Sequence, residues 1–328
     1  MSLTSLWAAP AAALRTPAGH PGLGRRDVGH VVVADPALAP AARRIAAAVL
    51  RDAARRTDLA RTRGVAWRLA RGGGSPVVVG PTDARLVAVA LEAARLTGGL
   101  VDPTVGTAVL QHAAGARAAR TARTAVLPGC ATFTAPRPRP AVGAEAVRVT
   151  GPAVSVPAGV VLDLSATTDA VAAHAAARAV ADRLRTGALV EVGGDVAQAG
   201  PAPDGGWGLL LADGAAVRLP AGRSASTVRP GATLVVDPRT GDAVPAAWSA
   251  VTVVHPDPLA AKAFALAAAV LGRGAAGWLD ARGLTYRLVG HDGGSLASPG
   301  WPRDVRPVAV PLPVPLPVPL PVPRRSVA

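Results

Sequence analysis

The sequence predicts an α+β fold in which mixed β-sheets carry packed helices. Segments rich in β-branched residues alternate with alanine-rich segments of helical periodicity, and several strand-like segments follow one another in hairpin-like pairs. Hydrophobic residues make up 50% of the 328 residues, but aromatic residues make up only 3%. The chain is therefore long enough for a sizeable core, and this core has to be built from small aliphatic side chains.

The first half of the chain shows clear start and stop signals for helices. Asp35-Pro36 is typical of a helix start, and Gly98-Gly99 is typical of a helix end. Thr82 and Asp83 are expected to cap the helix that precedes these glycines. The expected elements are a strand at 30–34, a helix from 35 onward, a strand at 77–79, a helix at 82–96, and a loop region over 113–141.

The second half reads as short strands around two long helices. Ala172, Ala176 and Val180 repeat at helical spacing within the first of these helices. An apolar strand runs from residue 189 into Gly193-Gly194. The other expected elements are strands at 147–149, 154–156, 160–164, 207–211, 251–254 and 284–289, a turn at 203–206, and helices at 169–185 and 259–271.

The two ends of the chain differ from the middle in composition. Residues 1–26 are rich in Ala, Pro and Gly without sustained periodicity, which predicts disorder. Proline at every second position in the Pro-Leu-Pro-Val repeats forbids helix and sheet, so 305–328 is predicted to be a disordered tail of polyproline-II character. It suits either a stiff spacer or an SH3-like ligand. The domains expected are therefore 1–26, 27–304 and 305–328.

Charge and cysteine content bear on partners and on the compartment. The net charge is +14, but Lys262 is the only lysine, and the arginines are scattered without interleaved aromatic residues. This composition indicates a GC-rich coding bias and does not favour specific nucleic-acid binding. No uninterrupted apolar run reaches the roughly 20 residues of a membrane span. The single cysteine, Cys130, has no partner for an internal disulfide, so we expect a cytoplasmic protein without a membrane span.

Three glycine-containing turns carry the polar groups that point to a function. They lie at residues 97–106, 191–195 and 237–241, and each combines glycine with an Asp or Thr oxygen. Glycine lets backbone N–H groups approach a ligand closely, amides in such turns favour phosphate, and carboxylates favour a hydroxyl group or a hard cation. One such turn alone is usually structural. We expect the Asp102, Asp195 and Asp237 turns to converge around one cleft.

In this order the three turns resemble the FAD:protein FMN transferases, the ApbE-type flavin transferases. Residues 97–106 (TGGLVDPTVG), 159–170, 191–195 and 237–241 (DPRTG) are similar to family motifs, and the resemblance runs from about residue 35 to 294. It implies an ApbE-like fold with a flavin cleft between subdomains. It also implies an enzyme that uses Mg²⁺ to transfer FMN from FAD to a Thr hydroxyl of an acceptor flavoprotein, with release of AMP.

The resemblance also implies which residues contact the flavin nucleotide. For the glycine and aspartate turns, a purely structural role is an equally good interpretation. The residues implied in cofactor binding are Asp102, Thr104, Thr168, Asp169, Gly193, Gly194, Asp195, Asp237 and Thr240.

The chain departs from the family pattern at charged positions. Asp169 stands where the family has a lysine, and His174 stands where an Asp normally follows on the same helix. From the residues alone, a solvated helix face is the expected place for both. Their catalytic roles are unassigned.

The metal ligands are changed as well. Lys262 and Leu266 occupy the positions of the family's metal-binding side chains, and neither binds Mg²⁺. The remaining candidates are the backbone carbonyl of Thr168, with Asp169 beside it, and Asp257. For Lys262, a lysine that reaches from an alanine-rich helix to solvent is the structural interpretation.

Three functional hypotheses follow. The first is an active FMN transferase with relocated metal ligands. The second is a catalytically degenerate relative that binds flavin nucleotide or acts as a scaffold. The third is an arginine-rich polyanion-binding protein.

Overall fold

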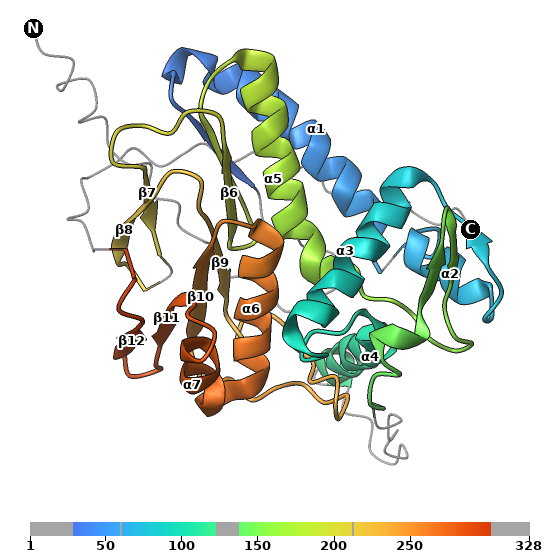
Figure 1. Cartoon of the computed structure of the whole chain (residues 1–328). Helices are drawn as coiled ribbons and strands as arrows, with labels where there is room; N and C mark the ends of the chain where they lie inside the picture. The colour runs from blue at the N-terminus through green and yellow to red at the C-terminus, as the bar shows by residue number, and fades with distance from the viewer. Residues whose placement is uncertain (1–28, 60, 123–137, 212, 303–328) are drawn as a thin grey trace, which may run out of the picture.

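The computed structural model of the chain describes residues 29–59, 61–122, 138–211 and 213–302 (Figure 1). It confirms the mixed α+β fold, with several sheets and helices packed on them. The predicted disordered segments 1–26 and 305–328, and Cys130, lie outside the described residues. The domain boundaries therefore stay predictions.

The largest sheet is antiparallel throughout and has the strand order β1-β5-β6-β9-β10-β11-β12. Most of these segments match the expected strands, whereas β6, β9 and β12 were not foreseen. The strands are β1 (His30–Val33), β5 (Ala188–Val192), β6 (Asp195–Ala199), β9 (Ser224–Val228), β10 (Ala250–His255), β11 (Thr285–Val289) and β12 (Ser295–Ala297).

Helices cover one face of this sheet and a hairpin covers the other (Figure 1). Val190 of β5 packs in one cluster with Ala173, whereas its neighbour Leu189 packs with Trp207. Successive side chains of a strand point to opposite faces, so this alternation defines the two layers. The helical layer contains α1 (Ala39–Thr57), α5 (Ser165–Leu184), α6 (Pro258–Leu271), η5 (Gly272–Gly274) and α7 (Ala275–Asp280), and the short 3₁₀ helix η2 (Pro36–Leu38) precedes α1. The hairpin consists of β7 (Trp207–Leu210) and β8 (Ala216–Leu219).

A smaller lobe extends from the edge of the helical layer (Figure 1). Its own apolar cluster includes Leu69, Val87 and Val154, and its three-stranded sheet has the order β2-β4-β3. The elements are α2 (Val65–Arg71), β2 (Val77–Val78), α3 (Pro81–Thr97), η3 (Pro103–Val105), α4 (Gly106–Ala122), η4 (Ala144–Ala146), β3 (Arg148–Thr150) and β4 (Ala153–Ser155). This lobe packs on the main sheet's helices through α3, whose Ala93 lies in one apolar cluster with α6 residues such as Leu259.

The predicted capping of α3 by Thr82 and Asp83 is wrong. The helix begins at Pro81 with Gly80 as its N-cap, and no side chain caps it. Asp83 is buried inside the first turn and accepts hydrogen bonds from the guanidinium groups of Arg56 and Arg68. Its carboxylate thus connects α3 to α1 and α2. The start of α3 needs no side-chain cap, because proline at the first helical position already suits it.

Two loop and strand assignments are also corrected. The predicted loop over 113–141 begins inside α4, which continues to Ala122, because an alanine-rich segment forms helix without a strong apolar period. Residues 123–137 lie outside the described part of the chain. The predicted strand at 160–164 pairs with no strand in the described structure, although Leu162 and Leu164 are buried. Its apolar pattern reflects burial of a connecting segment.

Helix α6 is apolar on all sides and lies in the core. Its buried residues include Leu259, Phe264 and Leu266, with alanine at most other positions. The continuous stretch Pro258–Asp280 is long and apolar enough by composition to cross a membrane, although it contains no uninterrupted apolar run of that length. However, 72% of its most apolar window is buried inside the protein. This is what the central helix of a folded core requires.

Candidate functional site

The Gly193-Gly194 turn joins β5 to β6 in a tight hairpin. Both glycines have positive φ, +59° and +94°, and Val192 pairs directly with Asp195. A two-residue turn with positive φ at both positions is of type I′, which glycine adopts without strain. A Cβ atom on Gly194 would lie 2.5 Å from the carbonyl oxygen of Thr227. The fold therefore requires both glycines.

Asp195 lies directly after this turn and is almost fully buried. The Ser226 hydroxyl donates to Asp195 Oδ1 at 2.5 Å, and Lys262 Nζ lies 3.1 Å from Asp195 Oδ2. Burial raises the pKa of Asp195, and the charge of Asp169 adds to this rise, whereas Lys262 and Ser226 act in the opposite direction. The Lys262 ammonium thus offsets part of the free energy of burying the carboxylate.

The interpretation of Lys262 as a solvent-reaching lysine is wrong. Its side chain is 11% exposed and points from α6 into the core, toward Asp195. The reason is that α6 is buried from Leu259 to Ala269, so the ammonium at position 262 is paired with a buried carboxylate. The sole lysine of the chain is therefore placed at the glycine turn.

Asp169 lies against the same turn from the α5 side. The side chain is half-buried, and a Cβ atom on Gly193 would lie 3.3 Å from Asp169 Oδ2. The prediction of a solvated helix face is therefore wrong for Asp169. Two carboxylates, Asp169 and Asp195, and one ammonium, Lys262, meet at the turn.

His174 lies further along α5 and is also half-buried, so a solvated face is wrong for this residue too. Its Nδ1 atom is buried without a hydrogen-bond partner among the described residues. Burial lowers the pKa of His174, Arg178 and Arg85 lower it further, and Asp257 raises it. The imidazole is therefore neutral around pH 7.

The Asp102 turn is a compact hydrogen-bonded unit. Asp102 Oδ1 accepts hydrogen bonds from the Thr104 N–H at 2.8 Å and from the Thr104 hydroxyl at 2.7 Å. Asp102 Oδ2 accepts from the Ala144 N–H at 2.8 Å, and the Gly143 N–H donates to Thr104 Oγ1 at 3.2 Å. These contacts begin η3 and attach the segment around residue 143 to it.

The Asp237 turn has a similar internal order. The Asp237 carbonyl accepts from the N–H groups of Thr240 and Gly241, and its carboxylate pairs with Arg239 at 2.7 Å. This pairing lowers the pKa of Asp237. Gly241 has φ +79°, and a Cβ atom there would lie 2.2 Å from the carbonyl oxygen of Arg139. The turn therefore packs directly on the segment that precedes residue 143.

Contacts connect the three turns into one continuous assembly. The Ala141 N–H donates to the Pro238 carbonyl at 2.7 Å, which joins the Asp237 turn to the segment that Asp102 and Thr104 hold. The Asp163 N–H donates to the Pro103 carbonyl at 2.7 Å, and Asp163 leads directly into α5, which carries Asp169 to the glycine turn. The structure thus links the three turns in series through neighbouring segments, while their convergence on one cleft and their contacts with a flavin nucleotide stay predictions.

The side chains at this assembly do not fit Mg²⁺. Lys262 and Leu266 supply no oxygen ligands, and among the described residues no group of three or more His, Cys, Asp or Glu side chains is close enough to hold a metal ion. A doubly charged ion on Asp195, roughly 4 Å from the ammonium, would meet a repulsion of about 8 kcal/mol at an effective dielectric constant of 20. The substituted positions are thus incompatible with the family's metal site.

The other two metal candidates already have structural partners. Asp257 is the N-cap of α6, and its Oδ1 atom accepts from the Leu259 N–H at 2.9 Å. Thr168 lies inside α5, where its hydroxyl donates to the Leu164 carbonyl at 2.6 Å and its own carbonyl belongs to the helical ladder. Neither group is positioned as part of a set of ligands.

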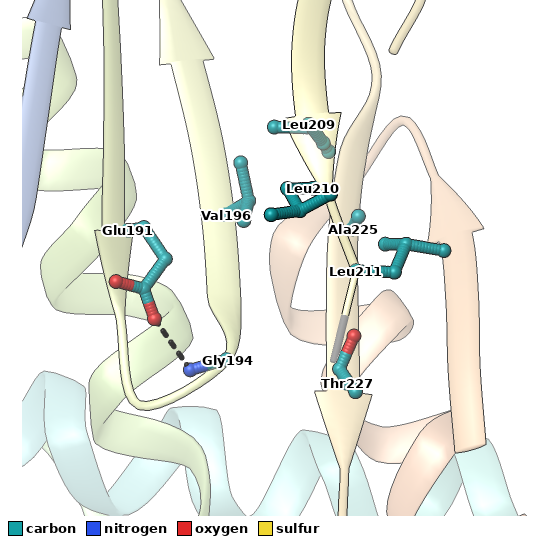
Figure 2. A pocket seen from close by; sticks show the side chains of 8 residues that line it. All are labelled: Glu191, Gly194, Val196, Leu209, Leu210, Leu211, Ala225 and Thr227. Atoms are coloured by element: carbon teal, nitrogen blue, oxygen red, sulfur yellow. Dashed lines mark hydrogen bonds between the residues drawn. The ribbon is translucent and has the colours of Figure 1, made fainter. Parts of the chain in front are cut away.

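Glu191 holds the glycine turn from the opposite face of the sheet (Figure 2). It is 2% exposed, and its Oε1 atom accepts from the Gly194 N–H at 2.8 Å. Figure 2 shows Glu191 and Thr227 beside a small hollow that is otherwise lined by apolar side chains, Val196, Leu209, Leu210, Leu211 and Ala225. The Glu191 carboxylate therefore holds the backbone of the turn from this face.

Sequence reasoning missed Glu191 and Ser226 as parts of this site. An acid inside an otherwise apolar strand was the available signal for Glu191, because such a residue needs a buried partner. The sequence around Ser226 gave no indication of its role, because Ser226 lies beside Asp195 only through the pairing of β6 with β9.

The comparisons with known proteins agree with this architecture. The model of the ApbE family matches residues 29–287. None of the curated protein sequences matches the chain significantly. The crystal structure of the ApbE protein from Thermotoga maritima is similar at 21% identity, with a TM-score of 0.64, over 84% of this chain and 96% of that chain.

Two further solved structures share the fold. The apo flavinyl transferase ApbE from Pseudomonas stutzeri is 18% identical, with a TM-score of 0.61, over 84% of this chain and 97% of that chain. The flavin transferase ApbE from Vibrio cholerae is 19% identical, with a TM-score of 0.58, over 82% of this chain and 91% of that chain. At these identities the likeness concerns the fold.

Proposed function

We propose, from the premise that the chain belongs to the ApbE family, that it is a flavin transferase which moves FMN from FAD to a Thr hydroxyl of an acceptor flavoprotein. In this reaction the Thr oxygen forms a bond to the phosphorus on the FMN side of the diphosphate. The bond between that phosphorus and the bridging oxygen breaks, AMP leaves, and the hydroxyl proton passes to solvent or to a base. We place this reaction in the cytoplasm.

Phosphoryl transfer makes modest chemical demands on a protein. It depends mainly on positioning and on groups that stabilise the charge of the phosphate oxygens. A rigid turn with close backbone approach, such as Gly193-Gly194, suits the first demand, and the Lys262 ammonium beside it suits the second. Asp102 and Asp237 hold their own turns, so we assign them the shaping of the flavin cleft.

The observation that carries this proposal is the continuity of the three family turns. Residues more than a hundred positions apart, such as Gly241 and His112, are joined by direct contacts: His112 Nε2 donates to the Gly241 carbonyl at 2.9 Å.

The test is FMN transfer by the full-length chain. The chain is incubated with FAD and an acceptor flavoprotein domain, and the matched control is the same domain with its target Thr changed to Val. We expect covalent flavin fluorescence on the Thr-containing acceptor, a mass increase of one FMN group and equimolar AMP. Absence of AMP and of labelled acceptor under conditions where FAD binds would contradict transferase activity.

A degenerate flavin-binding protein is the second candidate. The observation that favours it is the inverted charge at Asp169 together with the replaced metal positions. This candidate predicts FAD binding with no AMP release at any metal concentration.

A further inference from the structure

We propose that Lys262 is a built-in cation of the nucleotide site, so that the FAD diphosphate binds without a divalent metal ion. The inference rests on the proposed function, because it concerns the same site. It departs from the metal-dependent pattern that the family implies.

The position of the ammonium is the first argument. Lys262 Nζ lies 3.1 Å from Asp195 Oδ2, and Asp195 directly follows the Gly193-Gly194 turn. Helix α6 is capped at Asp257 and buried along its length, so the ammonium is held by rigid structure. A cation is therefore already present beside the residue that follows the turn, of which Gly193 is exposed.

The second argument is that this cation retains donors for a ligand. An ammonium group has three N–H donors, and Asp195 Oδ2 is one acceptor. The other carboxylate oxygen, Oδ1, accepts from the Ser226 hydroxyl at 2.5 Å. The Lys262 side chain keeps 11% of its surface exposed, whereas that of Asp195 is 1% exposed. Within this ion pair, the lysine side chain is therefore the more accessible member.

The third argument is competition for one carboxylate. Ammonium and a divalent ion bound to Asp195 would occupy overlapping positions and repel one another. Leu266, one helical turn after Lys262, is apolar and offers the metal no second ligand. Asp257 Oδ1 is engaged in capping. The Asp195 carboxylate can consequently bind either the lysine ammonium or a divalent metal ion, but not both.

The sequence makes the proposal unusually accessible to experiment. Among 35 basic residues, Lys262 is the only lysine, so lysine chemistry reports on one side chain. Reductive methylation with ¹³C-formaldehyde would label Lys262 and the N-terminal amine alone, and the two are told apart by Lys262→Arg.

The decisive measurement is FAD binding by the full-length chain, followed by flavin fluorescence, in EDTA and in Mg²⁺. We expect dissociation constants that agree within about twofold in the two buffers, since the diphosphate meets a resident cation. In the labelled protein, FAD should shift the methyl resonance of Lys262 and riboflavin should leave it in place. Tightening of FAD binding by Mg²⁺ of tenfold or more would overturn the proposal.

Variants separate the charge of Lys262 from its effect on folding. Lys262→Met alone would leave the buried Asp195 carboxylate without its ion-pair partner. The variant to be tested is therefore Lys262→Met combined with Asp195→Asn, which removes both charges. We expect this double variant to bind FAD at least tenfold more weakly, and to lose much more affinity for FAD than for riboflavin. Arg63→Met, which removes an exposed cation elsewhere, is the matched control and should bind both as the wild type does. Wild-type FAD affinity in the double variant would refute the role of Lys262.

The outcomes distinguish this inference from the proposed function. Metal-independent FAD binding without AMP release would leave the inference standing and remove the transferase function. FAD binding that tightens at least tenfold in Mg²⁺, together with AMP release and a labelled acceptor, would do the reverse. Failure to bind FAD in either buffer would overturn both.

Discussion

Lys262 and Asp195 place opposite charges in a core made of alanine and valine. The two side chains are 11% and 1% exposed, and Ser226 supplies the further hydrogen bond to the carboxylate. Removing one member of a buried ion pair is more damaging than removing both, because the remaining charge has no partner.

This asymmetry gives a prediction for stability. Lys262→Met should lower the free energy of unfolding by about 3–5 kcal/mol, whereas adding Asp195→Asn should recover a large part of that loss. Urea unfolding of the wild type, both single variants and the double variant would measure the coupling. Additive single effects would contradict the view that the two charges depend on each other.

Tyr286 provides a second test at the level of a single residue. It is the only tyrosine, it is 2% exposed, and its hydroxyl donates to Asp280 at 2.9 Å. Burial, followed by the hydrogen bond to Asp280, raises the pKa of Tyr286 from 10.0 to about 12. Because the folded state prefers the protonated phenol, this stabilisation is complete below pH 10 and is lost as the pH rises through about 12.

The absorbance of tyrosinate at 295 nm reads this ionisation directly, since no other tyrosine contributes. We expect a midpoint near 12 in the folded protein and near 10 in urea. The loss of stability at high pH should be up to about 3 kcal/mol, and Tyr286→Phe should abolish it. A folded-state midpoint of about 10 would mean that the phenol is solvated.

At the scale of elements, the hairpin β5–β6 is the most constrained part of the site. The Glu191 carboxylate accepts from the Gly194 N–H at 2.8 Å, and the Thr227 carbonyl oxygen lies close to Gly194. The Thr227 N–H also donates to the Gly194 carbonyl at 2.9 Å. Little freedom remains for this turn to move.

Gly194→Ala should therefore destabilise the protein strongly. The new Cβ atom would lie 2.5 Å from the Thr227 carbonyl oxygen at a residue with φ +94°, so steric overlap adds to backbone strain. We expect a loss of about 2–4 kcal/mol in urea unfolding. Gly222→Ala is the matched control, because it has φ +71° and no atom within 4 Å of its Cβ position. This control should lose only about 1–2 kcal/mol of the free energy of unfolding. Equal losses in the two variants would show that the overlap with the Thr227 carbonyl oxygen contributes nothing.

At the scale of the whole molecule, the main sheet, its helical layer and the smaller lobe enclose separate apolar clusters. The family match ends at residue 287, and β12 follows it at Ser295–Ala297. The site contacts described above all lie between Asp102 and Lys262, well inside the described residues.

A fragment of residues 27–304 should fold as the full-length chain does. We expect the same circular dichroism spectrum and a thermal midpoint within about 3 °C of the full-length value, because every buried contact between the described residues 29–302 is retained. Loss of cooperative unfolding in this fragment would show that the ends contribute to the core.

Much of the architecture was predictable from the chain alone. Helices α5 and α6, strands β1, β5, β10 and β11, and the glycine turns all follow from local pattern, because alanine-rich periodicity, β-branched runs and Gly-Gly punctuation act over a few residues. The family resemblance rested on the same local motifs, and the match over residues 29–287 confirms it.

What the tertiary structure decided concerns charged groups. Lys262, Asp169 and His174 were each expected at a solvated surface, and each is buried or half-buried. Sequence pattern cannot place these groups, because the partner of a buried charge depends on which elements pack together. The packing of α6 on β6 brings Lys262 to Asp195, and the pairing of β6 with β9 brings Ser226 to the same carboxylate. The backbone of the site was thus determined by local sequence, while its electrostatics arose only from the packing of distant elements.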